Sequence, residues 1–114
     1  NFKITLDIGN FMVADEDAAA AVKKVIPYAS MVHFKDFYVR PSHFNLGPDW
    51  IPTISGNLLR GAIFGHGDID AREIVRTIHD AGYDGAVSIE FEGIEDCLLG
   101  TSTGLENARR MLQD

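Results

Sequence analysis

The stretch MVHFKDFYVR, residues 31–40, has the alternation of a β-strand but carries charged residues at its centre. Val32 and Phe34 are typical of a buried strand surface, whereas His33 and Lys35 fall between them and so on the opposite face. Because burial of an unpaired charge is costly, this second face must meet solvent, partners or a ligand. The pattern predicts one strand with an apolar face and a polar face.

Residues 3–9 (KITLDIG) and 85–93 (GAVSIEFEG) show the same alternation, and a helix pattern follows each of the three strand patterns. The predicted helices span residues 15–26, 70–82 and 104–112, each with apolar residues at helical spacing. In the last helix this apolar stripe consists of Leu105, Ala108 and Leu112. Strands that alternate with helices predict parallel pairing with right-handed crossovers.

Capping residues define the predicted starts of the second and third helices. Asp70 with Glu73, and Thr103 with Glu106, have the spacing of a capping box. Gly82 is a typical signal for the C-terminal end of a helix.

Residues 41–68 form a long connection between the second strand and its helix. Within it, residues 50–64 are predicted to contain a β-hairpin around SGN, residues 55–57. A connection of this length inside a compact domain is usually functional.

The polar face of each strand distinguishes a barrel from a sheet that helices cover on both sides. A sheet covered by helices on both sides reads as continuous apolar runs, whereas these strands keep one polar face. That pattern predicts the wall of a barrel, with helices outside and polar residues at the mouth. Asp36 is expected to fall where its strand begins to leave the barrel. A complete (β/α)8 barrel needs roughly 250 residues. We therefore expect residues 1–114 to form a single partial-barrel domain of about three β/α units, and the chain to be a fragment.

Composition narrows the classes of partner and compartment. Hydrophobic residues make up 46% of the chain, and the formal net charge is −7. This charge disfavours nucleic acid as a partner, because the field of the protein repels phosphates. No apolar run approaches the ~20 residues of a membrane span. The single Cys97 fits a reducing compartment, and we expect a cytoplasmic protein.

Three residues that suit a metal ion occupy equivalent places on the three predicted strands. Asp7, His33 and Glu90 lie on the polar faces, each in the later part of its strand. In a parallel barrel this places them at the C-terminal rim. Two carboxylates and an imidazole suit Mn²⁺, Mg²⁺, Co²⁺ or Zn²⁺. The alternative is structural: a turn aspartate, a hydrogen-bonded histidine, and a glutamate that forms an ion pair with Lys35.

Further candidates for binding a substrate lie in the second strand and the long connection. Lys35 is suited to polarising a carbonyl group or neutralising the acidic site, or else to pairing with Glu90 or Glu92. Arg60 is suited to binding an oxygen or phosphate, and otherwise is a solvated loop residue. His66 lies between glycines in GHGD, where a backbone can approach a ligand, although the glycines also suit a turn.

Four motifs together resemble one family of barrels. LDIGN (6–10), VHFKD (32–36), GHGDID (65–70) and AGYDGAVSIEFEG (81–93) are similar to the C-terminal three β/α units of the xylose-isomerase-like TIM barrels. The resemblance covers nearly the whole chain and is specific to the superfamily rather than to one substrate. The group contains sugar phosphate isomerases and epimerases, inosose dehydratases, and DNA repair enzymes of the endonuclease IV type.

The resemblance implies a divalent-metal-dependent reaction. Asp7, His33 and Glu90 match the metal ligands of the family, and Glu90 is also implied to act as a catalytic acid or base. A further glutamate ligand would precede Asn1. The implied activity is isomerisation or epimerisation of a sugar or sugar phosphate, by proton transfer through an enediolate. We expect the present chain alone to be inactive.

Two alternatives remain open beside the isomerase. One is a non-catalytic α/β module with a structural ion network, and the other is a metal-dependent repair nuclease. Asn10 stands where some relatives have a histidine, which weakens the nuclease reading, as the acidic charge does. Neither a nucleic acid nor a membrane is expected as a partner. Because a partial barrel leaves open sheet edges, we expect a homo-oligomer or an exchange of elements between copies.

Overall fold

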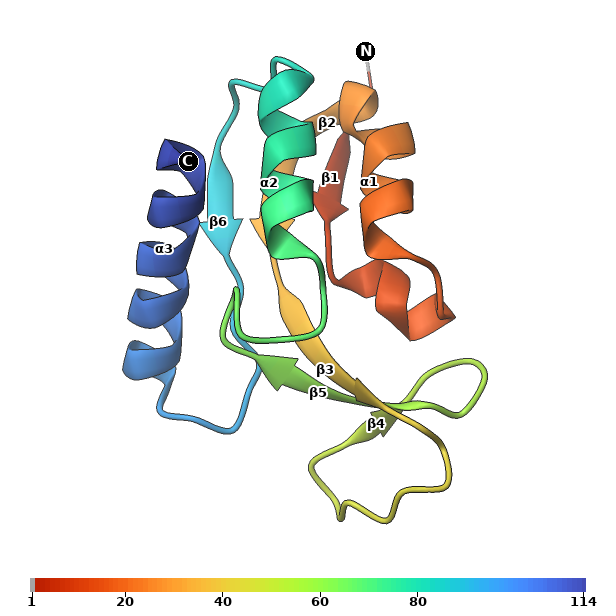
Figure 1. Ribbon diagram of the computed structural model, residues 1–114. Coiled ribbons are helices and arrows are strands. Elements are labelled where there is room, and N and C mark those ends of the chain that lie inside the picture. The colour runs from red at the N-terminus through yellow and green to blue at the C-terminus, as the bar shows by residue number, and fades with distance from the viewer. Residues whose placement is uncertain (1) are drawn as a thin grey trace.

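The computed structural model describes residues 2–114, which form two three-stranded sheets and three α-helices (Figure 1). The elements in chain order are β1 (Ile4–Asp7), the 3₁₀ helix η1 (Asn10–Ala14), α1 (Ala18–Val25), the 3₁₀ helix η2 (Ile26–Tyr28), β2 (Ala29–Phe34), β3 (Asp36–Arg40), β4 (Ile51–Pro52), β5 (Leu58–Ala62), α2 (Ala71–Asp80), β6 (Val87–Ile89) and α3 (Cys97–Gln113).

The first sheet is parallel, in the order β1-β2-β6, as the alternation of strands and helices predicted. Its register places Asp7 beside His33, and His33 beside Ser88. The ladder continues beyond the strand ends, because the Glu90 N–H donates to the carbonyl of Phe34 at 3.0 Å. The described strands form an open sheet rather than a closed barrel, which fits part of a TIM barrel.

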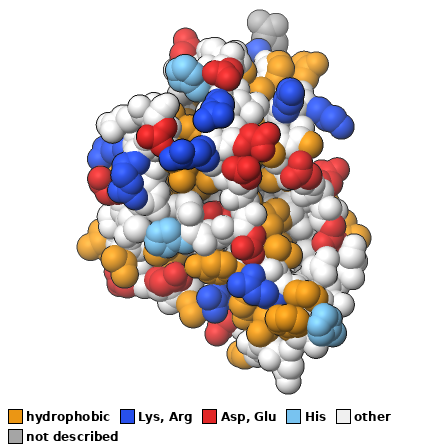
Figure 2. Space-filling view, viewed as in Figure 1, with side chains coloured by type: hydrophobic (Ala, Val, Ile, Leu, Met, Phe, Trp, Pro, Cys, Tyr) orange, Lys and Arg blue, Asp and Glu red, His pale blue; other side chains and the backbone are white. Residues whose placement is uncertain are grey.

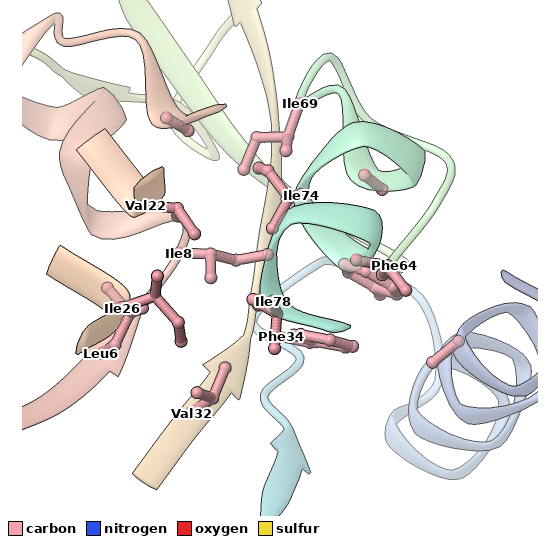
Figure 3. Packing of buried hydrophobic residues seen from close by; sticks show 14 residues of the cluster. Leu6, Ile8, Val22, Ile26, Val32, Phe34, Phe64, Ile69, Ile74 and Ile78 are labelled. Carbon is pink, nitrogen blue, oxygen red and sulfur yellow. The ribbon is translucent and has the colours of Figure 1, made fainter. Parts of the chain in front are cut away.

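Helices α1 and α2 cover one face of this sheet, and α3 lies beside β6 (Figure 1). Apolar side chains from the strands and from α1 and α2 meet between these layers (Figure 3). The rings of Phe34 and Phe64 stack at a centroid distance of 4.6 Å and extend the core toward α3. The largest fully buried apolar side chains are Phe34, Phe64, Ile8, Leu59, Ile74, Val22 and Val32.

The second strand is divided, so the prediction of one continuous strand over residues 31–40 was wrong, although the chain does leave the parallel sheet at Asp36 as expected. β2 ends at Phe34, and β3 joins a separate antiparallel sheet in the order β3-β5-β4. The division falls beside Asp36, a residue that is 1% exposed. Its carboxylate accepts hydrogen bonds from the backbone N–H groups of Phe37, Gly65, Gly67 and Ile69. These contacts draw the chain away from the parallel sheet and toward the segment that precedes α2.

The predicted hairpin within the long connection is confirmed. β4 and β5 pair antiparallel, with Ile51 beside Leu59. Gly56 has φ +88 in the turn between them, a conformation that glycine adopts without strain. The hairpin also pairs with β3, with Tyr38 beside Arg60, which the sequence did not reveal.

The helix boundaries differ in how well local signals predicted them. α2 agrees with prediction, because Asp70 caps it by accepting from the Glu73 N–H at 3.1 Å. The predicted start of the first helix at residue 15 was wrong. Asp15 has φ +57, outside the helical region, and Asp17 is the residue that caps α1.

The predicted start of the last helix at residue 104 was also wrong. α3 begins at Cys97, and the Asp96 side chain caps it by accepting from the Leu99 N–H at 3.0 Å. Glycines hid its first half, because glycine is a weak helix former. Gly100 is nevertheless required there, because a Cβ atom would lie 2.5 Å from the ring of Phe91.

The predicted apolar stripe of the last helix was only partly correct. Ala108 is buried at 4% exposure, whereas Leu105 and Leu112 are 39% and 56% exposed. None of the helices within residues 2–114 combines the length and the apolar character needed to cross a membrane.

Candidate metal centre

Asp7, His33 and Glu90, here called the ligand cluster, come together at the C-terminal ends of three neighbouring parallel strands. Asp7 is the last residue of β1, His33 lies in β2, and Glu90 directly follows β6. Side chains alternate along each strand, so all three project from the face that α1 and α2 do not cover. One potential ligand atom from each residue lies within 4.8 Å of the other two. The predicted juxtaposition is therefore present.

Asp7 is the most rigidly held member of the ligand cluster. Its Oδ1 atom accepts hydrogen bonds from the backbone N–H groups of Gly9 at 3.0 Å and Asn10 at 3.1 Å. These bonds orient the carboxylate and leave Oδ2 directed at its neighbours. Oδ2 lies 3.9 Å from His33 Nδ1, and the side chain is 10% exposed.

His33 and Glu90 form a closer and more accessible pair. His33 Nδ1 lies 3.2 Å from Glu90 Oε2, and their side chains are 32% and 36% exposed. A carboxylate oxygen only accepts, so Nδ1 carries the proton in this hydrogen bond. Binding of a metal through Nδ1 requires the other tautomer, with the proton on Nε2. Glu90 is the most exposed member of the ligand cluster.

Lys35 lies beside the ligand cluster and contacts every acidic side chain there. Its Nζ atom lies 3.0 Å from Glu92 Oε1, 3.3 Å from Glu90 Oε1 and 3.4 Å from Asp7 Oδ2. It also donates to Asn10 Oδ1 at 3.1 Å. Burial on its own lowers the pKa of Lys35, but the hydrogen bond to Glu92 and the surrounding carboxylates outweigh it and raise the pKa. The side chain is therefore an ammonium at neutral pH.

The ligand cluster fits a divalent ion in donor type, spacing and charge. Atoms that bind one ion at about 2.1 Å lie roughly 3.0 to 4.2 Å apart. The separations of His33 Nδ1 from Glu90 and Asp7 oxygens, 3.2 and 3.9 Å, fall in this range. Three carboxylates, including Glu92, face one ammonium, which leaves two negative charges for an ion to neutralise.

Arg60 lies apart from the ligand cluster. It is in β5, where its guanidinium lies 5.2 Å from the Tyr38 ring and 5.0 Å from the Trp50 ring. Arg60 shares a face with its partner Tyr38, whereas Phe37, whose ring lies 5.8 Å from Lys35 Nζ, projects to the other face. Figure 2 shows basic and hydrophobic side chains together in this lower part of the molecule. A role for Arg60 in binding a substrate stays a prediction.

His66 is likewise apart from the ligand cluster. It is exposed in the loop between β5 and α2, and it borders a surface groove with Asn107 and Met111 of α3. In the structure of residues 2–114, no hydrogen bond or ion pair joins His66 or Arg60 to the ligand cluster. The role of His66 in binding a substrate also stays a prediction.

Two residues near the site have roles that sequence reasoning missed. Asn10 accepts a hydrogen bond from Lys35, whereas the sequence identified it only as a departure from a histidine. Gly9 allows the segment after β1 to pack closely on the segment after β2, because a Cβ atom there would lie 2.8 Å from the carbonyl oxygen of Lys35. The only signal for both was their place directly after the strand that ends in Asp7.

The parallel sheet is open and has helices on one face. Its other face carries potential ligands at the C-terminal ends of the strands. This arrangement is that of the wall of a β/α-barrel protein. The family model described as xylose isomerase-like TIM barrel matches residues 1–114. The chain belongs to the xylose isomerase-like TIM barrel family, which confirms the resemblance of its motifs. This family includes isomerases and epimerases, and its members often bind metals. A search of curated proteins found no match to the chain.

Proposed function

We propose that the chain forms part of a divalent-metal-dependent barrel that isomerises or epimerises a sugar or sugar phosphate. The observation that carries this proposal is the ligand cluster, in which one atom each of Asp7, His33 and Glu90 lies within 4.8 Å of the others. Further β/α units are needed to close the barrel around it, and they are the expected source of a fourth protein ligand.

The three residues have different roles in this proposal. Asp7 serves as a fixed ligand, because two backbone N–H groups hold its carboxylate. His33 supplies the nitrogen ligand through Nδ1. Glu90 is both a ligand and the group that takes or returns a proton at the carbon beside a carbonyl, since its carboxylate is partly exposed. A bound divalent ion supplies a Lewis acid that stabilises negative charge on the substrate oxygens.

The test is calorimetric titration of the EDTA-treated protein with MnCl₂. We expect one binding event, which is weakened at least about tenfold by His33→Ala, because it removes a ligand, or by Glu90→Gln, because it replaces a charged ligand with a neutral one. His79→Ala is the matched control, since this exposed histidine lies on α2 and should leave affinity unchanged. Unaltered Mn²⁺ affinity in both His33→Ala and Glu90→Gln would contradict the proposal.

The ion pairs of Lys35 favour a second candidate, a non-catalytic module in which the charged residues form a structural network. Lys35 Nζ lies within 3.4 Å of carboxylates from Asp7, Glu90 and Glu92. The ammonium therefore offsets part of their mutual repulsion without a metal ion. This candidate predicts that Mn²⁺ neither binds nor raises the melting temperature. The same titration therefore separates it from the enzyme.

The edges of the parallel sheet support a proposal about assembly. Ile4 on β1 and Val87 on β6 are 40% and 42% exposed, although both belong to strands. β1 and β6 are the outer strands of the sheet, and each has one partner within residues 2–114. We propose that these edges pair with further strands or with a second copy of the chain. Elution of this chain as a strict monomer at high concentration would argue against pairing between copies.

A further inference from the structure

A cation already lies among the carboxylates of the candidate metal centre, and it belongs to the protein itself. The ammonium of Lys35 is 3.3 Å from an oxygen of Glu90 and 3.4 Å from an oxygen of Asp7. Both residues belong to the ligand cluster, so the lysine and a divalent ion would draw on the same two carboxylates.

The position of Lys35 is constrained from several sides. The residue is 6% exposed, and its Nζ atom is fixed by Asn10 Oδ1 at 3.1 Å and by Glu92 Oε1 at 3.0 Å. The ring of Phe37 lies 5.8 Å from Nζ. Because Gly9 has no side chain, the backbone packs closely over the lysine stem. The ammonium is therefore held at the site rather than free to move into solvent.

We propose that Lys35 is a positioning residue that holds the carboxylates of the candidate metal centre together and competes with the divalent ion for them. This inference rests on the metal site proposed above. It assigns Lys35 to setting the affinity for the ion, whereas the sequence suggested direct contact with substrate. The contacts favour this role, since three N–H donors already face four oxygens, those of Asp7, Asn10, Glu90 and Glu92.

Competition and simple structural support predict opposite effects when the ammonium is removed. Two like charges a few ångströms apart repel, so Lys35→Met should tighten Mn²⁺ binding by about tenfold or more. If Lys35 only supported the geometry of the ligands, its removal would instead weaken Mn²⁺ binding. The variant leaves three carboxylates without a cation, so it should also gain more affinity for a trivalent ion such as Tb³⁺ than for Mn²⁺.

The experiment compares the wild type, Lys35→Met and Lys24→Met by titration with MnCl₂ after EDTA treatment. Lys24 is an exposed lysine on α1, so its variant controls for the same change in net charge. Thermal unfolding with and without MnCl₂ is the second readout. We expect Lys35→Met to melt at a lower temperature without the ion, to recover more on its addition, and to bind it more tightly. Lys24→Met should behave as the wild type does.

Each outcome for Lys35→Met decides the inference. If Lys35→Met is unfolded without the ion, circular dichroism follows whether it folds when MnCl₂ is added. Folding supports competition between Lys35 and the ion, and failure to fold overturns the inference. Unchanged or weaker Mn²⁺ binding also overturns it. If Mn²⁺ binding depends on His33 and Glu90 but is the same in Lys35→Met as in the wild type, the inference about Lys35 is wrong and the proposed metal site stands. Absence of binding in both proteins refutes the metal site as well.

Discussion

Asp36→Ala removes the side chain that joins the two sheets. The Oδ1 atom of Asp36 accepts from the N–H groups of Phe37 at 2.8 Å and Ile69 at 3.3 Å. Its Oδ2 atom accepts from Gly65 at 3.0 Å and Gly67 at 2.9 Å. One carboxylate thus holds the start of β3 against the segment that leads into α2.

The expected loss of stability follows from the groups that are left without an acceptor. The N–H groups of Phe37 and Ile69 are buried, and an unpaired buried donor costs about 1–3 kcal/mol. Burial raises the pKa of Asp36 although the four hydrogen bonds oppose it, so burying this carboxylate costs free energy. The alanine variant does not pay this desolvation cost, which offsets part of the loss. We therefore expect the free energy of unfolding to fall by about 2–4 kcal/mol.

Equilibrium unfolding in urea measures this change. Asp84→Ala is the matched control, because Asp84 is exposed, and its variant should stay within about 0.5 kcal/mol of the wild type. A loss of less than about 1 kcal/mol for Asp36→Ala would show that the four hydrogen bonds to this buried carboxylate do not hold the junction between the two sheets.

Two further substitutions test local features. Hydrogen bonds from the Thr53 side chain, the Ser55 backbone and the Asn57 side chain lower the pKa of Asp15 from 3.8 to about 2. Asp15→Asn should therefore lower the melting temperature above pH 3.8, and the difference from the wild type should shrink as pH falls through about 2 and vanish below it. Gly100→Ala should destabilise the protein by about 1–3 kcal/mol in urea, because overpacking against Phe91 outweighs the better helix propensity of alanine. A stabilised Gly100→Ala would show that this contact relaxes.

Local patterns predicted the parallel strands and α2 well, because the signals lie within each segment. Alternation places Asp7 and His33 on one face of the sheet. Asp70 caps α2 by accepting a hydrogen bond from the N–H of Glu73, only three residues further along the chain. Parallel strands carry equivalent positions to the same edge of a sheet, so the meeting of Asp7, His33 and Glu90 followed from their places in the strands.

The features that prediction missed depend on contacts between distant segments. The division of the strand after Phe34 depends on Asp36, whose partners Gly65 and Gly67 are about thirty residues away. The early start of α3 depends on packing of Gly100 against Phe91, which overrides weak helix propensity. Each of these depends on the tertiary structure, which no window of local sequence contains.

The contacts of Lys35 within the site were likewise only partly predictable from the sequence. Its ion pair with Glu92 was among the alternatives read from the sequence, and it is present at 3.0 Å. Its hydrogen bond to Asn10 was not predicted, because Asn10 follows a different strand and reaches the lysine only through the turn after Asp7.

Anomalous diffraction from crystals of the protein soaked in MnCl₂ shows whether these strand ends bind a metal ion. We expect one strong peak within about 2.3 Å of oxygens from Asp7 and Glu90 and of Nδ1 of His33. A peak at another place, or none beside these residues at saturating Mn²⁺, would contradict the claim that these strand ends form a metal centre.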